Sequence, residues 1–477
     1  MSQLPVDCLN YILEYLKDDV KTLHSCILVN HLWCEISVRI FWIEIRNYYT
    51  IIACLPNDSK EILCKIGFNN LISTLKPPIF NYASFCKILS IDKVHYKIGE
   101  LLKNQKSTLL QNIYNNIHLV MQEICKMLMN QTSSLKSLTF HHPSITNFIP
   151  FVYYPGANDC LKNLSELRCN SNISSEFFYQ LSKTCHNIIL LEIIIDRNIS
   201  NGLADLISIQ KNLKYVSITQ YSNLKDTLPS LITKLPNILI KLNLTSANFI
   251  SLLFITKFIN LQELILSFDY EGQFKDFEKF QYAIFPQLQV LRIRRVCPRD
   301  ELLINFLENN GKNLKEIYIG GIGSCNENSL HLTIAKFCPN LKKLCIGFKN
   351  NKLETLKMIS DNCQYLESIK ILCGGYYSSE KEALKAVAKY SQNITELILY
   401  HLFSKQLRSF PEELESFFKS WTSHVPLKSI SLVVVTNYIC ESSLDKYDEN
   451  MEVIKKYIKL GVIKKFKVTD FDDEEYN

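Results

Sequence analysis

The residues of this sequence whose spacing could support chemistry are a pair of histidines and a pair of glutamates. His141 and His142 are adjacent and could begin a metal site, but no further ligand cluster lies near them. Glu412 and Glu413 follow a proline, and acidic residues at such a helix start favour the helix dipole. The sequence has no phosphate-binding G-x-x-x-x-G-K-[ST], no H-E-x-x-H and no EF-hand loop. We therefore expect no catalytic residue, no cofactor and no metal ion.

The cysteines and the charge balance narrow the class of protein. None of the 17 cysteines forms a C-x-x-C pair, which argues against a zinc site or a disulfide framework and favours a reducing compartment, the cytoplasm or the nucleus. The 53 basic and 47 acidic residues give a net charge of +6 over 477 residues, which points to neither nucleic acid nor a membrane surface. Only 13 residues are glycine, so tight left-handed turns should be few.

Internal repeats organise most of the chain. The unit is Leu-x-x-Leu-x-Leu, with Ile, Val or another residue replacing Leu in several copies. Twelve copies begin at residues 135, 164, 188, 213, 239, 261, 288, 314, 341, 366, 394 and 427, and a weaker copy, IKKFKV, begins at 463. The spacing averages about 26 residues, and the pattern is that of the leucine-rich repeat, whose period is roughly 20–29 residues.

Each repeat has room for one strand and one return. The alternating apolar residues predict a short strand, and residues 299–308, 329–337 and 381–390 have helical patterns. The sequence therefore predicts an α/β fold in which a curved solenoid of about 12–13 repeats covers residues 131–477, with a parallel sheet on its concave face and a short acidic tail.

One position of the repeat departs from the consensus, and another position holds cysteine in three copies. The ninth position, usually Asn or Cys, is Asn172 in one copy but a different residue in most others, so a regular hydrogen-bond ladder is not expected. Cys185, Cys338 and Cys363 each lie three residues before the first Leu of a copy. This placement resembles the cysteine-containing class of leucine-rich repeats, which is common in ubiquitin-ligase adaptors.

The apolar residues of the N-terminal 45 positions are spaced differently, and their spacing predicts three short helices. Leu9, Ile12, Leu13 and Leu16 follow the i, i+3, i+4, i+7 pattern of one helix face. A module this small buries little area and should leave apolar surface for a partner. Between residues 46 and 130 we expect a helical linker and a cap for the solenoid, the cap being a helix around 117–127.

The ordered set Leu-Pro, Asp, Leu-x-x-Ile-Leu-x-x-Leu, Leu and Val-Asn-x-x-Trp resembles the F-box motif. Its residues are Leu4, Pro5, Asp7, Leu9, Ile12, Leu13, Leu16, Leu23, Val29, Asn30 and Trp33. The whole chain resembles members of the expanded F-box families of plant-symbiotic fungi. The resemblance implies that residues 1–45 are an F-box and that its apolar positions, all of the above except Asp7 and Asn30, dock onto a Skp-type adaptor and through it a cullin.

The implied function is that of a non-catalytic substrate receptor in a Skp–cullin–F-box ubiquitin ligase. An alternative is a leucine-rich-repeat scaffold or regulatory binder acting outside a ligase, in which the N-terminal helices only close the solenoid. A substitution such as Leu13→Asp is expected to abolish adaptor binding and leave folding intact.

The solenoid is expected to hold an unidentified protein target. The outward strand positions carry five basic and five acidic residues: Arg168, Lys241, Arg292, Lys343 and Lys370 against Glu166, Glu192, Glu263, Glu316 and Glu396. This balance argues against a nucleic-acid reader, which should show a one-signed stripe. Aromatic residues are enriched at binding hot spots, so the predicted contacts are Tyr221, Phe268, Tyr270, Arg292, Tyr376, Tyr377 and Tyr400.

Overall fold

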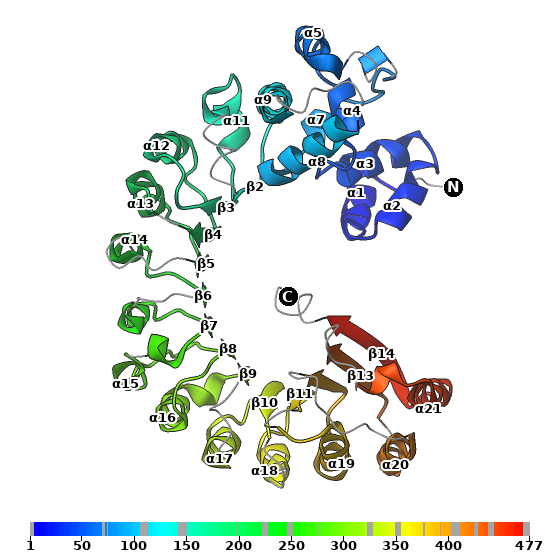
Figure 1. Ribbon diagram of the computed structural model, residues 1–477, viewed down its shortest axis with the longest axis vertical. Helices are drawn as coiled ribbons and strands as arrows, with labels where there is room; N and C mark the ends of the chain where they lie inside the picture. The colour runs from blue at the N-terminus through cyan, green and yellow to red at the C-terminus, as the bar shows by residue number, and fades with distance from the viewer. Residues whose placement is uncertain are drawn as a thin grey trace. The chain divides into compact units, whose positions relative to one another are not determined.

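A computed structural model describes most of the chain. The described residues are 4–68, 72–73, 75–104, 113–141, 150–196, 198–221, 228–245, 251–274, 276–321, 328–348, 354–374, 377–391, 393–401, 411–423, 428–436 and 443–470. The chain divides into two compact units, Met1–Pro236 and Asn237–Asn477. In both, strands alternate with helical returns (Figure 1).

Among its described residues, the first unit contains three N-terminal helices, the nine helices that follow them, two helical turns and the first five strands. Its α-helices are α1 (Val6–Glu14), α2 (Val20–Ile27), α3 (His31–Phe41), α4 (Tyr48–Ala53), α5 (Asn57–Leu63), α7 (Tyr82–Phe85), α8 (Ile91–Lys103), α9 (Ile113–Gln131), α11 (Ala157–Leu161), α12 (Ser175–Thr184), α13 (Asn201–Ser208) and α14 (Leu228–Lys234). The helical turns are η1 (Cys64–Phe68) and η3 (Phe151–Tyr153), and the strands are β1 (Ile88–Ser90), β2 (Ser137–Phe140), β3 (Glu166–Asn170), β4 (Leu190–Ile195) and β5 (Tyr215–Gln220).

The second unit continues the same alternation through nine strands. These are β6 (Lys241–Thr245), β7 (Glu263–Phe268), β8 (Val290–Arg295), β9 (Glu316–Gly321), β10 (Lys343–Gly347), β11 (Ser368–Cys373), β12 (Glu396–His401), β13 (Ile430–Thr436) and β14 (Ile463–Asp470). The returns are η4 (Leu252–Lys257), η5 (Glu271–Phe274), α15 (Phe277–Phe280), α16 (Asp300–Asn310), η6 (Gly311–Asn313), α17 (Asn328–Phe337), α18 (Thr355–Asn362), α19 (Glu380–Tyr390), α20 (Pro411–Thr422), η7 (Leu444–Lys446) and α21 (Asp448–Lys459).

The strands confirm the repeat pattern. All twelve clear copies of the motif and the weaker copy at 463 contain a strand, β2 to β14. Within each unit, neighbouring strands pair in parallel and in chain order. In the second unit, the helices lie on one side of the sheet and leave its other side open (Figure 1). The fold is therefore a leucine-rich-repeat-like α/β solenoid, and the helices expected at 299–308, 329–337 and 381–390 are α16, α17 and α19.

One strand lies before the first predicted copy. Strand β1 lies inside the segment that was expected to be a linker, and it pairs with β2. The outer edge of β1 is covered by the chain that leaves α3, because the Ile43 carbonyl accepts from Lys87 N at 2.8 Å and from Ile88 N at 3.0 Å. The expected helix around 117–127 exists as α9, which packs against α8 and α11, and its role as a cap for the solenoid stays a prediction.

Buried side chains before the strands join adjacent repeats. The Cys185 thiol donates to the Leu161 carbonyl at 3.3 Å, and the Cys363 thiol donates to the Cys338 carbonyl at 3.3 Å. In the repeat that follows the one with Cys185, the equivalent position is Gln210. Its side chain accepts from Ile188 N at 2.9 Å and donates to the Cys185 carbonyl at 2.7 Å. These contacts satisfy backbone groups that the repeat boundary would otherwise bury without partners.

Candidate functional site

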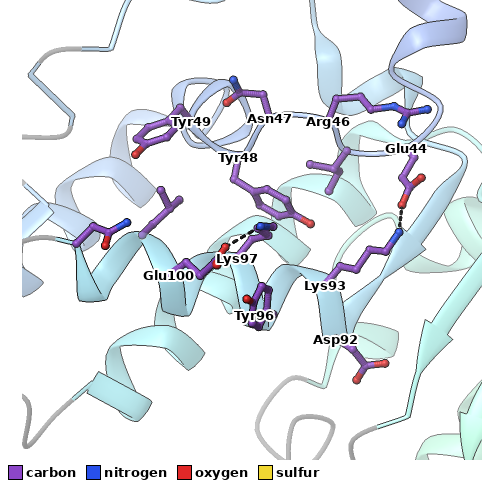
Figure 2. A pocket seen from close by; sticks show the side chains of 13 residues that line it. Glu44, Arg46, Asn47, Tyr48, Tyr49, Asp92, Lys93, Tyr96, Lys97 and Glu100 are labelled. Carbon is purple, nitrogen blue, oxygen red and sulfur yellow. Dashed lines mark hydrogen bonds and ion pairs between the residues drawn. The ribbon is translucent and has the colours of Figure 1, made fainter. Parts of the chain in front are cut away.

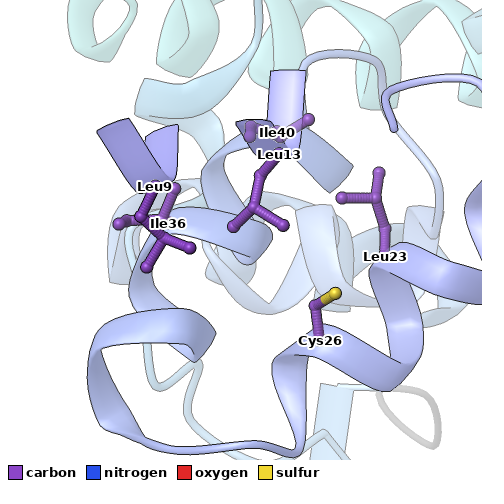
Figure 3. Close-up of a cluster of buried hydrophobic side chains, with 6 residues drawn as sticks. All are labelled: Leu9, Leu13, Leu23, Cys26, Ile36 and Ile40. Carbon is purple, nitrogen blue, oxygen red and sulfur yellow. The ribbon is translucent and has the colours of Figure 1, made fainter. Parts of the chain in front are cut away.

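The three N-terminal helices enclose a small hydrophobic core of their own. It is formed by buried residues of α1, α2 and α3: Leu9, Leu13, Leu23, Cys26, Ile36 and Ile40 (Figure 3). Leu16 and Trp33 are half-buried against this cluster. Because Leu13 is fully excluded from solvent, an aspartate there would bury a charge without a partner. Leu13→Asp should therefore destabilise the module rather than leave its folding intact.

Capping side chains fix where the second and third helices begin. The Asp19 carboxylate accepts from Thr22 N at 3.1 Å and from the Thr22 hydroxyl at 2.6 Å, and these bonds lower the pKa of Asp19. Asn30 accepts from Trp33 N at 3.0 Å. The asparagine of the Val-Asn-x-x-Trp motif thus acts as a helix cap, and it positions the turn that carries Val29.

Exposed apolar side chains are concentrated in this three-helix module. In the part of the chain that the structure describes, eight of the 29 exposed large hydrophobic residues fall between positions 4 and 29, namely Leu4, Val6, Tyr11, Ile12, Tyr15, Val20, Leu28 and Val29. The first helix divides its apolar residues between two environments, since Leu13 is 0 % exposed and its neighbour Ile12 is 46 % exposed. Single exposed apolar residues are common on proteins, but a dense set marks an interaction surface.

The predicted adaptor contacts therefore separate by environment. Leu4, Pro5, Ile12 and Val29 are exposed and open to a partner. Leu9, Leu13 and Leu23 lie in the core and can only support the surface from beneath, because their own side chains already fill the space between the helices. A helical pattern identifies apolar faces but not which side of a short helix the core takes.

A groove lies where the module joins the first strand (Figure 2). It has a volume of about 870 Å³ and is lined by the segment from Glu44 to Tyr49 and by one side of α8. An ion pair of 2.5 Å between Lys93 Nζ and Glu44 Oε1 closes one end. Burial raises the pKa of Tyr48 above its ordinary value, so its phenol is neutral at physiological pH. Sequence reasoning missed this groove because its two walls are about fifty residues apart in the chain.

The outward strand residues form ion pairs between neighbouring strands. The pairs are Arg168 Nη1–Glu192 Oε2 at 3.5 Å, Lys241 Nζ–Glu263 Oε1 at 3.0 Å and Arg292 Nε–Glu316 Oε1 at 2.6 Å. On this face, therefore, three of the predicted basic residues are each paired with a glutamate on the next strand. Of the predicted substrate contacts, Arg292 is one partner of such a pair.

The predicted aromatic contacts also differ in environment. Tyr221 and Tyr270 are exposed, at 69 % and 68 %, and can meet a ligand. Phe268, Tyr377 and Tyr400 are buried, at 1 %, 5 % and 5 %, which corrects the expectation that they present their rings to a partner. Phe268 packs against Phe274, with 4.9 Å between ring centroids. Tyr377 and Tyr400 belong to a cluster with Cys345, Leu372 and Val435. Tyr376 lies outside the described residues.

Groups that could do chemistry are engaged structurally in the described part of the chain. The backbone N–H of His141 donates to the Asp92 carboxylate at 2.8 Å. His142 lies outside the described residues. Glu413 forms an ion pair with Lys381 beside the start of α20. No group of three or more His, Cys, Asp or Glu side chains is placed to hold a metal ion among the described residues. Burial raises the pKa of Cys125 and of Cys185 to about 12, so these thiols are poor nucleophiles at neutral pH.

Within the ranges that the structure describes, no helix is both long and apolar enough to cross a bilayer.

Comparisons with known proteins found matches among solved structures. No protein-family model and no curated protein matches the chain. A chain in the crystal structure of the Rad7 and Elc1 complex in yeast is 14% identical with a TM-score of 0.36, the match covering 73% of this chain and 88% of that one. The leucine-rich repeat-containing protein LegL7 from Legionella pneumophila is 13% identical with a TM-score of 0.33, covering 61% of this chain and 92% of its own. Neither likeness is used to assign a function. The repeats of the chain and its order of strands and helices give it the fold of a leucine-rich-repeat solenoid.

Proposed function

We propose that the chain is a substrate-receptor subunit of a Skp–cullin–F-box ubiquitin ligase. In this proposal the three-helix module docks onto the Skp-type adaptor and the repeats hold a target protein. One observation supports it above others: the F-box-like motif falls on three helices that bury its Leu9, Leu13 and Leu23, while Leu4, Pro5, Ile12 and Val29 stay exposed. A module that served only to close the solenoid would have no need of that exposed apolar set.

The exposed apolar residues supply the docking energy in this proposal. Burying a Val, Leu or Ile side chain contributes roughly 1.5–3 kcal/mol when the burial is complete. Leu4, Ile12 and Val29 are 54 %, 46 % and 57 % exposed, so about half of that area is still available to a partner. A few such anchors dominate most protein–protein interfaces. The chain itself contributes proximity rather than a reacting group, since it holds the target near an enzyme bound elsewhere in the assembly.

Co-purification with a Skp-type adaptor tests the docking step. Leu4→Ala with Pro5→Ala, Ile12→Asp and Val29→Asp should each weaken adaptor binding at least about tenfold. Their thermal unfolding should match that of the wild type because these side chains lie outside the core. Leu460→Asp is the matched control, since Leu460 is 62 % exposed but lies directly after the last helix, α21, far along the chain from the motif. Adaptor binding at wild-type strength by all three motif variants would contradict the proposal.

The same experiment separates the alternative, a leucine-rich-repeat scaffold that acts outside a ligase. A scaffold would leave the adaptor and the cullin unbound by the wild-type chain even when the chain is folded. Its Ile12→Asp variant would then behave as the wild type in every binding measurement.

A further inference from the structure

The last strand of the second unit has an open edge. Strand β14 pairs in parallel with β13, and among the described residues no strand lies on its other side (Figure 1). In the first unit, by contrast, the outer edge of β1 is covered by the chain at Ile43. An open edge presents a row of backbone N–H and C=O groups, and such a row can pair with an added strand.

The hydrogen bonds of β13 indicate which residues of β14 face the open edge. Ser431 N donates to the Thr395 carbonyl at 2.8 Å, on the side of β12, so the backbone groups of the next residue, Leu432, face β14. Leu432 is opposite Phe466 in the parallel register. In a parallel ladder, the register partner of a residue that faces it turns its own groups away. Phe466 and, by alternation, Val468 therefore present N–H and C=O groups at the open edge.

The two sides of β14 differ in chemistry. Phe466 shares a side of the sheet with the buried Leu432, yet it is only half-buried, and Val468 on the same side is 42 % exposed. Lys465 and Lys467 lie on the other side, and both are exposed. Within the described part of the chain, neither lysine forms an ion pair. A strand with apolar residues on one side and acidic residues on the other would complement both sides of β14.

The surroundings of this edge are basic. Strand β14 carries three lysines and one carboxylate, Asp470, which gives 3 − 1 = +2. Helix α21 packs against β14 and adds the exposed Lys455 and Lys459. Charge of one sign attracts a segment of the opposite sign and speeds its association. The edge therefore favours an acidic segment.

A second copy of the same strand fits this edge poorly. Two β14 strands paired antiparallel about Phe466 would set Lys465 of one copy opposite Lys467 of the other, and like charges directly opposite destabilise a pair. Lysines on edge strands commonly prevent such self-pairing. They do not oppose a strand of opposite charge, so the same residues select an acidic partner.

We propose that the open edge of β14 binds an extended acidic segment of a partner protein, which adds to the sheet as one more strand. The backbone groups of Phe466 and Val468 pair with the added strand. Its acidic side chains lie beside Lys465 and Lys467, and its apolar side chains lie beside Phe466 and Val468. In this mode of recognition, main-chain hydrogen bonds give affinity and alternate side chains give specificity. The proposal does not depend on the ligase role proposed above.

Fluorescent peptides of eight residues, the length of β14, test the edge by anisotropy with the full-length chain. One peptide alternates Glu and Val, and a second alternates Lys and Val. The Glu–Val peptide should bind at least about ten times more tightly than the Lys–Val peptide, and its affinity should fall as salt is raised. Equal affinities of the two peptides would overturn the proposal.

N-methylated peptides separate strand addition from simple charge attraction. Two further Glu–Val peptides carry N-methyl groups on one or the other set of alternate residues, which leaves their charge unchanged. One of the two should bind at least about tenfold more weakly, because its methyl groups replace the N–H groups that pair with β14. Undiminished binding by both would show that no strand is added and would overturn the proposal.

Charge-reversal variants localise the binding. Lys465→Glu with Lys467→Glu should weaken binding of the Glu–Val peptide at least about tenfold and strengthen that of the Lys–Val peptide. Lys357→Glu with Lys385→Glu is the matched control, because it changes the net charge equally at exposed positions of α18 and α19. Thermal unfolding checks that each variant is folded, and Lys465→Ala with Lys467→Ala is the second variant if the reversal is not. Wild-type affinity of a folded β14 variant for the Glu–Val peptide would overturn the assignment.

Two further measurements use the same samples. In sedimentation velocity, a concentration-dependent dimer that excess Glu–Val peptide dissociates would place a second copy on the edge and overturn the proposed partner. Peptide recognition with no adaptor binding would refute the ligase proposal and leave the edge in place. Adaptor binding with no recognition of the Glu–Val peptide would refute the edge alone.

Discussion

His401 Nε2 lies 2.8 Å from Glu380 Oε1, and both side chains are excluded from solvent. Glu380 stands in the first turn of α19, and His401 ends strand β12. The Glu380 carboxylate also accepts from Leu444 N at 3.4 Å, so it joins a helix, a strand and the segment after β13. A buried contact of this kind is costly to break because either partner alone is left without its counterpart.

Glu380→Ala should lower the free energy of unfolding by about 3–5 kcal/mol, as measured by urea titration. Glu308→Ala removes an exposed carboxylate from α16 and should change it by less than about 0.5 kcal/mol. A double-mutant cycle with His401→Ala should give a coupling energy above about 1 kcal/mol. Additive effects in that cycle would show that the two side chains do not support each other.

Leu13→Ala should lower the free energy of unfolding by about 2–5 kcal/mol, because it opens a cavity in the three-helix core. Ile12→Ala, one residue away on the exposed side, should change it by less than about 0.5 kcal/mol. Hydrogen exchange of the α1 to α3 amides reports the stability of this module separately from that of the repeats. Equal protection of those amides in the two variants would contradict the assigned core.

Gly347→Ala should lower the free energy of unfolding by about 1–3 kcal/mol, because the added methyl group collides with the Tyr377 ring. The matched control is Gly272→Ala, where an added Cβ meets nothing within 4 Å. Tyr377→Ala should abolish most of the extra cost of Gly347→Ala in a double variant. Thermal unfolding of the four proteins checks this, and equal costs for the two glycine substitutions would disprove the close approach.

Stability should fall with rising pH above about 9. Burial raises the pKa of Cys86, Cys125 and Cys185 to about 12 in the folded chain, whereas an exposed thiol titrates near 9. The folded state therefore holds protons that the unfolded state releases, so this contribution is complete below pH 9 and is lost as the pH rises towards 12. Urea titrations at pH 8 and pH 10.5 measure the loss, and Cys125→Ala should make it smaller. An unchanged slope in that variant would show that Cys125 does not contribute.

The repeat strands could be predicted from sequence because each one carries the same apolar alternation. Strand β1 could not, since its three residues end directly at α8 and contain one buried side chain, Leu89. The exposures of Ile12 and Leu13 depend on how three short helices pack, which no single helical pattern encodes. Tyr377 and Tyr400 read as loop aromatics in the sequence, but a glycine on a neighbouring strand gives the Tyr377 ring a place to lie flat. Arg292, Tyr318, Cys345 and Lys370 come from four different repeats, so only the register between strands brings them into one row.

The parallel register places Arg292 on β8, Tyr318 on β9, Cys345 on β10 and Lys370 on β11 in one row across the sheet. Parallel strands stand about 4.8 Å apart, so these two cations are separated by three steps, or about 14 Å. An extended peptide advances about 3.4 Å per residue, and about four of its residues span that distance. Residues four apart in an extended chain point to the same side. The spacing of Arg292 and Lys370 along this row therefore equals the spacing of side chains four positions apart on one side of an extended chain.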